Sequence, residues 1–139
     1  MPKNVILAAG LPASPERLYE MYVDAKLHSA FTGKTAVIEP RAGAAFSAFD
    51  GVLTGKILHV VPGKQIVQTW RSPNFPAGAI DSTLILTFFA QSVDGMEGRI
   101  ELHHINVPEE DFSGITNGWE KFYWTPWRAY LLANHAAEL

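Results

Sequence analysis

The sequence predicts an α+β protein in which a curved antiparallel sheet packs against one long C-terminal helix. Residues that alternate between apolar and polar fill the middle of the chain, whereas the last segment, 114–139, is apolar at helical spacing. The expected element order is β-α-α-β-β-β-β-β-β-α, and short loops between consecutive strands favour antiparallel pairing. The 139 residues are expected to form one domain, over 1–139.

The N-terminal part is expected to hold one strand and two short helices. Residues 4–11 form a short apolar run that is typical of a strand. Ser14, Pro15 and Glu16 then mark a helix start, with a capping side chain, a proline at the first helical position and an acid in the first turn. The second helix is expected over 24–33, where a glycine ends it.

The middle of the chain is expected to form most of the sheet. Asp50-Gly51 and Pro62-Gly63-Lys64 are turn signals between strands, and the two prolines and the glycine of 72–80 mark a longer loop. The expected strands cover 35–39, 44–49, 52–61, 65–71, 81–90 and 97–107.

The final helix is expected to have a wide aromatic face, because residues 119–130 hold six tryptophan, tyrosine and phenylalanine side chains. So wide an apolar face needs a concave surface to cover, and a curved sheet provides one. Asn117 is expected to cap the helix, with Glu120 completing a capping box. Pro126 removes one backbone hydrogen bond and clashes with the carbonyl of Phe122, so we expect a kink that divides the helix into two segments.

Composition limits the classes of function open to the chain. The sequence contains no cysteine, which excludes disulfides, thiolate catalysis and cysteine-based metal sites. With a formal net charge of −3 and basic residues scattered singly, nucleic-acid binding is not expected. The N-terminal apolar run is broken by Gly10 and Pro12, so neither a signal peptide nor a membrane span is expected, and a cytoplasmic location follows.

Few polar groups are placed for catalysis or metal binding. His103 and His104 are adjacent in an expected strand and point to opposite faces, so they cannot share one metal. His104 lies on the apolar face and is expected to point inward, as a hydrogen-bonded core histidine or as a polar handle for a ligand. No phosphate loop, nucleophile elbow or zinc-helix motif occurs, so we expect no cofactor, no metal and no catalytic residue.

The other titratable groups are expected in contact with solvent. His28 and His135 are assigned to solvated faces of their helices. The acidic run 109–111 is expected to form a solvated turn, which is favourable before the start of a helix. Glu39 and Arg41 flank a proline in a turn and are expected at the surface. None of these groups forms a pair suited to acid–base catalysis.

The large apolar side chains of the sheet and the last helix form the candidate binding site. They are expected to meet between sheet and helix, where they either fill a core or line a small-molecule cavity of about 300–1,000 Å³. The sequence leaves both alternatives open. Tyr22 and Phe31, on the two short helices, are expected at the mouth of such a cavity. The expected ligand-binding residues are Phe46, Trp70, Leu86, Phe88, Leu102, His104, Trp119, Phe122, Tyr123 and Pro126.

A series of short motifs, each weak alone, follows a specific order and spacing along the chain. The motifs are Ser14-Pro15-Glu16-Arg17-Leu18-Tyr19, Gly43-Ala44-Ala45-Phe46 with Asp50-Gly51, Gly55-Lys56-Ile57, Pro62-Gly63-Lys64 with Val67 to Trp70, and Asn117-Gly118-Trp119-Glu120 with Phe122-Tyr123-Trp124 and Pro126. In this order they resemble the Hsp90 ATPase activator homologue (AHSA1-like) family of the START/Bet v 1-like, or SRPBCC, superfamily. The resemblance implies the helix-grip fold, with about seven antiparallel strands around a long C-terminal helix and two short helices at one end.

The resemblance implies two functions of different classes. The superfamily commonly holds lipids, sterols or aromatic molecules between sheet and helix, which implies a non-enzymatic protein that binds a small hydrophobic molecule. The family name implies instead a partner of the stress-response chaperone Hsp90, although the named eukaryotic activators carry a further N-terminal domain and the chain matches only their C-terminal domain. A cyclase-like or hydrolytic enzyme on the same fold stays open as a third hypothesis. A monomer or weak dimer is expected.

Overall fold

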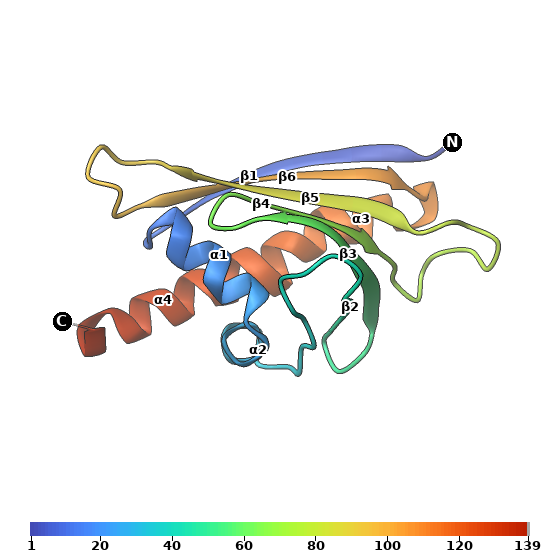
Figure 1. The fold of residues 1–139 in the computed structure, drawn as a ribbon. Coiled ribbons are helices and arrows are strands. Elements are labelled where there is room, and N and C mark those ends of the chain that lie inside the picture. The colour runs from blue at the N-terminus through green and yellow to red at the C-terminus, as the bar shows by residue number, and fades with distance from the viewer. Residues whose placement is uncertain (139) are drawn as a thin grey trace.

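The computed structural model describes residues 1–138, with side chains described through Asn134, and its elements form two layers (Figure 1). A curved antiparallel sheet is one layer, and all the helices lie on its concave side. In chain order the elements are β1 (Lys3–Leu11), α1 (Pro15–Val23), α2 (Ala25–Thr32), β2 (Ala45–Ala48), β3 (Leu53–Val61), β4 (Gln65–Trp70), β5 (Ser82–Ala90), β6 (Gly98–Val107), η1 (Glu109–Asp111), α3 (Phe112–Gly118), η2 (Trp119–Trp124) and α4 (Thr125–Glu138). The predicted α+β class and the long C-terminal helix are confirmed.

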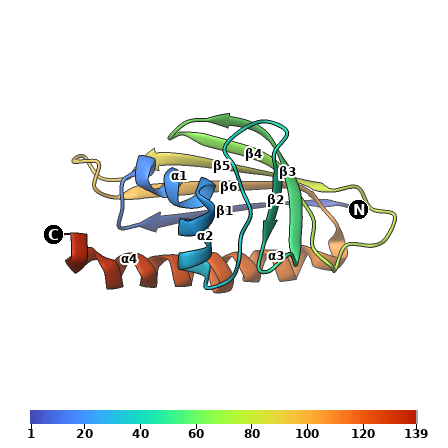
Figure 2. The same ribbon diagram turned by 60° about the horizontal axis from the view of Figure 1, so that its bottom comes forward.

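The sheet has the strand order β1-β6-β5-β4-β3-β2, and every neighbouring pair is antiparallel. The register pairs Leu86 of β5 with Ile66 on one side and with Leu102 on the other. All three side chains are buried, so they form an apolar row across the sheet that faces the helices. The hairpin of β2 and β3 turns out of this layer toward the C-terminal helix (Figure 2).

The sheet has six strands, not the seven expected, because residues 35–39 do not form a strand. This segment pairs with β2 only at Val37, whose N–H donates to the carbonyl of Ser47 at 2.8 Å and whose carbonyl accepts from the N–H of Ser47 at 2.9 Å. Pro40 follows soon after and has no N–H to donate, so the ladder is not extended.

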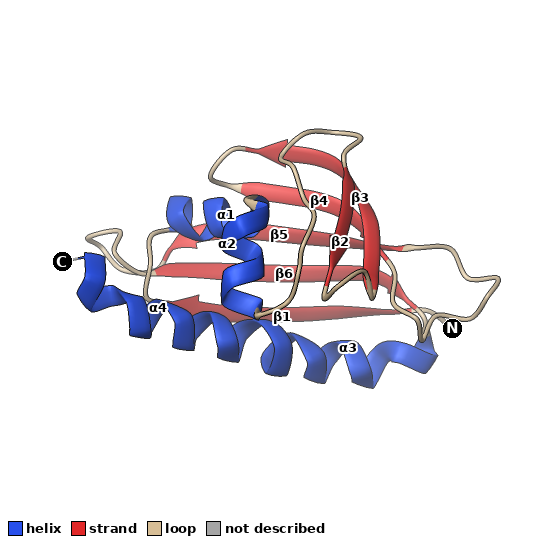
Figure 3. Cartoon of the chain, turned by 90° about the horizontal axis from the view of Figure 1, so that it is seen from below, coloured by secondary structure: helices blue, strands red, loops and turns tan. Residues whose placement is uncertain are grey.

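Both short helices begin where the sequence predicts, and the second also ends there. Ser14 Oγ accepts a hydrogen bond from the N–H of Arg17 at 3.2 Å, which caps α1. Asp24 Oδ1 accepts from the N–H of Leu27 at 3.0 Å, which caps α2. Gly33 ends α2 in the left-handed conformation, with a φ of 79°. Both helices cover the concave face at one end of the sheet (Figure 3), where α1 packs against β5 and β6 and α2 against α4.

The C-terminal helix begins earlier than predicted. It follows directly from η1 and starts at Phe112, so Asn117 lies inside the helix and does not cap it. Asp111 occupies the position before the helix, but its side chain makes no capping hydrogen bond. The capping-box pattern at Asn117 is therefore a local sequence signal that the preceding turn overrides. No helix in the described part of the chain combines the length and the apolarity needed to span a membrane.

A π-helical segment accommodates Pro126 and separates α3 from α4 within one continuous helix. Residues Trp119–Trp124 are π-helical, and the N–H of Thr125 donates to the carbonyl of Glu120, five residues back. Proline cannot donate to the carbonyl four residues before it, and the wider π turn relieves the clash at that carbonyl. The helix therefore continues without a break into α4, which contains Pro126 as its second residue.

Candidate ligand-binding site

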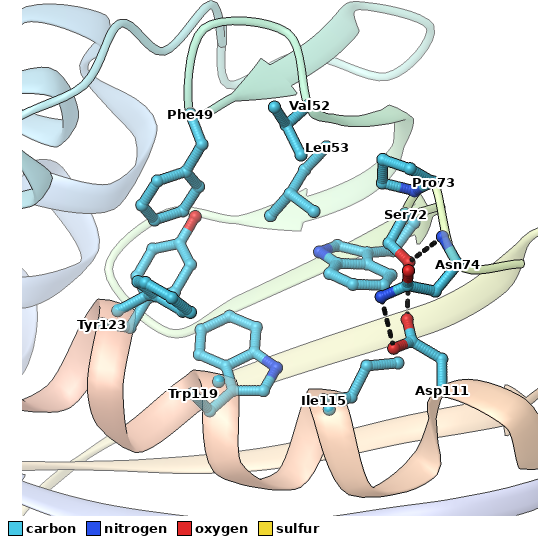
Figure 4. A pocket seen from close by; sticks show the side chains of 14 residues that line it. Phe49, Val52, Leu53, Ser72, Pro73, Asn74, Asp111, Ile115, Trp119 and Tyr123 are labelled. Carbon is cyan, nitrogen blue, oxygen red and sulfur yellow. Dashed lines mark hydrogen bonds between the residues drawn. The ribbon is translucent and has the colours of Figure 1, made fainter.

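A cavity of about 400 Å³ lies between the tip of the β2–β3 hairpin, the loop after β4 and the first half of the C-terminal helix (Figure 4). Its volume falls within the range of small-molecule sites. The residues that line it come from three separate parts of the chain and are mostly apolar. They are Phe49, Val52, Leu53, Trp70, Ser72, Pro73, Asn74, Asp111, Gly114, Ile115, Gly118, Trp119, Phe122 and Tyr123.

The hairpin wall depends on a tight turn. Phe49, Asp50 and Gly51 have positive φ angles of 54°, 59° and 87°, and this turn directs the ring of Phe49 toward the helix (Figure 4). There the Phe49 ring packs edge-on against Tyr123, with ring centroids 5.4 Å apart, and against Phe122 at 5.9 Å. The turn thus closes the cavity on the side that faces the short helices.

The opposite side of the cavity is a polar corner formed by Ser72, Asn74 and Asp111 (Figure 4). Ser72 Oγ donates to Asp111 Oδ2 at 2.5 Å, and Asn74 Nδ2 donates to Asp111 Oδ1 at 3.1 Å. The Asp111 side chain is 3% exposed, whereas Glu109 and Glu110 are exposed. The prediction of a solvated acidic turn is therefore wrong for Asp111, because the loop after β4 folds over its carboxylate.

The helix supplies the floor of the cavity through Ile115, Trp119, Phe122 and Tyr123. The rings of Trp119 and Tyr123 stack with centroids 4.3 Å apart. Both residues are buried, while Phe122 is 49% exposed and forms part of the rim. Trp119, Phe122 and Tyr123 belong to the π-helical segment, so the widened turn that accommodates Pro126 also determines where these three rings lie.

A buried hydrogen-bond network lies behind the Tyr123 ring. His28 is fully buried, and its predicted position on a solvated face is wrong, because the face of α2 that holds it packs against the C-terminal helix. His28 Nδ1 donates to the carbonyl of Tyr22 at 2.8 Å, which leaves Nε2 to accept from the Tyr123 hydroxyl at 2.9 Å. Burial lowers the pKa of His28 to about 4 and raises the pKa of Tyr123. His135 lies outside the residues whose side chains are described.

His104 points into the core but does not line the cavity. Ser82 Oγ donates its one proton to the carbonyl of Trp70 at 2.8 Å, so His104 Nε2 donates to Ser82 Oγ at 2.7 Å. His104 Nδ1 and Trp70 Nε1 have no hydrogen-bond partner within the described residues. Burial lowers the pKa of His104 to about 3, since a second proton on the ring would have no acceptor.

Four of the ten expected ligand-binding residues line the cavity: Trp70, Trp119, Phe122 and Tyr123. Pro126 is half-buried outside the cavity. The other five are buried in the core between sheet and helices and do not line the cavity. These are Phe46, Leu86, Phe88, Leu102 and His104.

The two residues expected at the mouth of the cavity are instead buried in the core. Tyr22 is fully buried and donates its hydroxyl proton to Gln68 Oε1 at 2.6 Å. The Phe31 ring stacks on Trp127 with centroids 4.2 Å apart. The structure therefore places neither residue at the cavity, because α1 packs against β5 and β6 and α2 packs against α4.

Most of the hairpin and loop residues at the cavity were not expected from the sequence. Phe49 and Val52 stand on either side of the Asp50-Gly51 turn, where apolar side chains are out of place unless they contact another part of the chain. Two apolar side chains beside this turn are therefore a sequence signal that could have indicated Phe49 and Val52 as site residues. No comparable signal in the sequence indicates Ser72, Asn74 and Asp111. They come together only because the loop after β4 folds against the start of the C-terminal helix.

In the described part of the chain, no group of three or more histidine, aspartate and glutamate side chains is arranged to hold a metal ion. The cavity lining contains one carboxylate, one phenol and no histidine. The arrangement therefore offers an apolar, aromatic surface with a single charged corner.

The sheet, the C-terminal helix and the cavity between them place the chain in the helix-grip class of folds. The chain is similar to the crystal structure of an HSP90 activator from Plasmodium falciparum, with a TM-score of 0.82 and 21% identity over 92% of this chain and 95% of that one. It is also similar to the solution structure of the Aha1 dimer from Colwellia psychrerythraea, with a TM-score of 0.72 and 15% identity over 88% of this chain and 92% of that one. At these identities, the likeness establishes the fold.

The chain belongs to the AHSA1 family, described as activator of Hsp90 ATPase homolog 1-like protein, whose family model matches residues 12–131. It is 35% identical over 113 residues to the human activator of 90 kDa heat shock protein ATPase homolog 1, an alignment that covers 79% of this chain and 31% of the relative. With the Dictyostelium discoideum homologue it shares 31% identity over 120 residues, or 86% of this chain and 30% of the relative. The chain therefore spans about a third of the length of these relatives.

Proposed function

We propose that the chain is a non-enzymatic binding protein that holds a small hydrophobic molecule in the cavity beside the C-terminal helix. The observation that supports this most is the cavity itself, about 400 Å³ and lined by five aromatic side chains. Flat apolar rings with few polar groups are typical of sites that bind small molecules. The five are Phe49, Trp70, Trp119, Phe122 and Tyr123.

The phenol at the cavity and the two buried histidines behind it favour binding over catalysis. Acid–base chemistry needs a donor and an acceptor whose pKa values lie near the working pH. Tyr123 is a poor candidate, because burial raises its pKa further above neutrality. The histidines with lowered pKa, His28 and His104, lie behind the cavity wall and do not line it.

The proposal is tested by titrating isotopically labelled protein with indole and recording amide chemical shifts. We expect the shifts to concentrate in the three segments that line the cavity, 49–53, 70–74 and 111–123. Leu53→Trp adds bulk to the cavity wall and should abolish these shifts, whereas Leu132→Trp, at an exposed site on α4, should leave them unchanged. Shifts scattered over the surface, or equal shifts in both variants, would contradict binding in the cavity.

A second candidate function is contact with Hsp90. Membership of the AHSA1 family supports it, as do the names of the relatives, which are activators of the Hsp90 ATPase. We propose that such contact takes place in the cytoplasm, where the sequence leads us to expect the chain. Calorimetric titration of the chain into Hsp90 from its own organism tests this function. Saturable binding at micromolar concentration supports it, and the absence of heat at that concentration removes it.

A further inference from the structure

We propose that the cavity prefers a positively charged ligand, an aromatic or alkyl ammonium, and that Asp111 is the group that selects it. This inference rests on the proposed ligand-binding function and specifies the chemical class of the ligand. It combines a buried carboxylate that has no cationic partner with a wall of aromatic rings.

Asp111 is the only formally charged residue among those that line the cavity. Its carboxylate is buried, and each oxygen accepts one hydrogen bond from a neutral group, Ser72 or Asn74. A carboxylate has about four acceptor positions, so capacity for a further donor remains. No lysine or arginine in the described part of the chain forms an ion pair with it. A buried charge without a counter-ion is costly, and a cationic ligand at this corner would reduce that cost.

The aromatic wall favours the same class of ligand. A cation is attracted to the face of an aromatic ring within about 6 Å of its centroid, and rings grouped around a pocket recognise ammonium groups. Phe122 already makes such a contact inside the protein, since Lys121 Nζ lies 5.3 Å from its ring centroid. The stacked pair of Trp119 and Tyr123 and the edge-on Phe49 bring further rings to the same cavity.

The start of the C-terminal helix acts in the opposite direction. A helix N-terminus is equivalent to roughly half a positive charge, which stabilises Asp111 and weakens attraction for a cation. The full negative charge of Asp111 exceeds this partial charge. Glu109 and Glu110 add two exposed carboxylates beside it, although Glu109 is paired with Lys3 at 3.7 Å and with the N-terminal amine at 3.5 Å. The sum of the formal charges at this corner therefore remains negative.

Three molecules with the same phenylethyl body and different head groups test this preference. Phenethylamine is cationic at neutral pH, 2-phenylethanol is a neutral donor and 3-phenylpropionate is an anion. Because charge-assisted hydrogen bonds are about twice as strong as neutral ones, we expect phenethylamine to bind at least about tenfold more tightly than the alcohol, and the anion to bind most weakly. Amide shifts in the lining segments report each affinity.

Asp111→Asn should bring the affinities for amine and alcohol to within about twofold of one another, the ratio expected once the ion pair is lost. Glu110→Gln removes the same charge from an exposed neighbour and should leave the preference in place. If Asp111→Asn does not fold, the affinities of the unchanged protein for the three ligands still decide whether the cavity prefers a cation. An alcohol that binds as tightly as the amine overturns the cation preference and leaves the proposed function standing. Failure of all three to bind at millimolar concentration overturns both.

Discussion

At the scale of single residues, His28 and His104 make stability depend on pH. Both rings are buried and neutral, and burial lowers their pKa values from 6.5 to about 4 and about 3. Below pH 6.5 the unfolded chain therefore binds protons that the folded chain does not. The stability that depends on the two rings being neutral is therefore complete above pH 6.5. It is lost as the pH falls toward the lowered pKa values of the two histidines.

We expect the free energy of unfolding to decrease as the pH is lowered below about 6.5. The slope should approach about 1.4 kcal/mol per pH unit for each histidine. Urea unfolding at several pH values between 7.5 and 5 measures this slope. His28→Gln and His104→Gln should each remove about half of it. A stability that stays constant over this range would show that the two rings are not buried in the neutral form.

The hydroxyl of Tyr123 has a structural role that its ring does not share. Tyr123→Phe keeps the stacking on Trp119 but leaves His28 Nε2 buried without a donor, so we expect a loss of about 1–3 kcal/mol in the free energy of unfolding. Tyr130→Phe is the matched control, because the Tyr130 hydroxyl makes no hydrogen bond within the described residues and its ring is only half-buried. Denaturant unfolding compares the two variants, and equal stabilities would contradict the network.

At the scale of elements, two glycines allow strands to approach neighbouring backbone closely. A Cβ on Gly55 would lie 2.0 Å from the carbonyl oxygen of Thr69, so this residue lets β3 bend past the end of β4. A Cβ on Gly98 would lie 2.5 Å from Leu18 Cδ1 and 2.8 Å from the carbonyl oxygen of Ala13, which is the point where α1 starts over β6. The first glycine positions the hairpin wall of the cavity, and the second positions α1.

Gly98→Ala is expected to destabilise the chain by about 1–3 kcal/mol, because the start of α1 must move to make room for the added methyl group. Gly78→Ala provides the control, since a Cβ at that loop position meets nothing within 4 Å. Thermal unfolding of both variants measures the difference. A Gly98→Ala protein as stable as the control would mean that α1 does not pack on β6 as closely as described.

The elements that the sequence predicts well are those defined by a local pattern. The cap at Ser14, the end of α2 at Gly33 and the alternation along β4 to β6 depend on nearby residues alone, and the structure confirms them. Residues 35–39 alternate like a strand, yet hydrogen bonding to β2 is limited to Val37. The local pattern at Pro126 predicts an irregularity in the helix, and the structure shows that it takes the form of π-helical turns directly before this residue.

Apart from Trp70 on β4, the candidate site was predictable only on its helical side. Trp119, Phe122 and Tyr123 share the aromatic face that helical spacing indicates, and they lie at the cavity. The loop after β4 and the buried Asp111 meet across 39 residues of sequence, through the hydrogen bond from Ser72. Such long-range contacts leave no periodic signal, which is why the polar corner of the cavity became apparent only in the structure.

At the scale of the whole molecule, the cavity exists only when distant parts of the chain are assembled. Its walls come from the β2–β3 hairpin, the loop after β4 and the C-terminal helix, and unfolding separates all three. A ligand that binds this cavity therefore binds the folded state and not the unfolded chain. By mass action it must then stabilise the whole fold, and not only the residues that it touches.

Indole at a hundredfold excess over its dissociation constant is expected to raise the free energy of unfolding by about 2.7 kcal/mol, and the melting temperature with it. Leu53→Trp, which narrows the cavity, should lose this increase, while Leu132→Trp on the exposed face of α4 should keep it. Differential scanning calorimetry at several indole concentrations provides the measurement. If the melting temperature rises equally in both variants, indole stabilises the fold from another place, because only the Leu53 change alters the cavity that the hairpin, loop and helix enclose together.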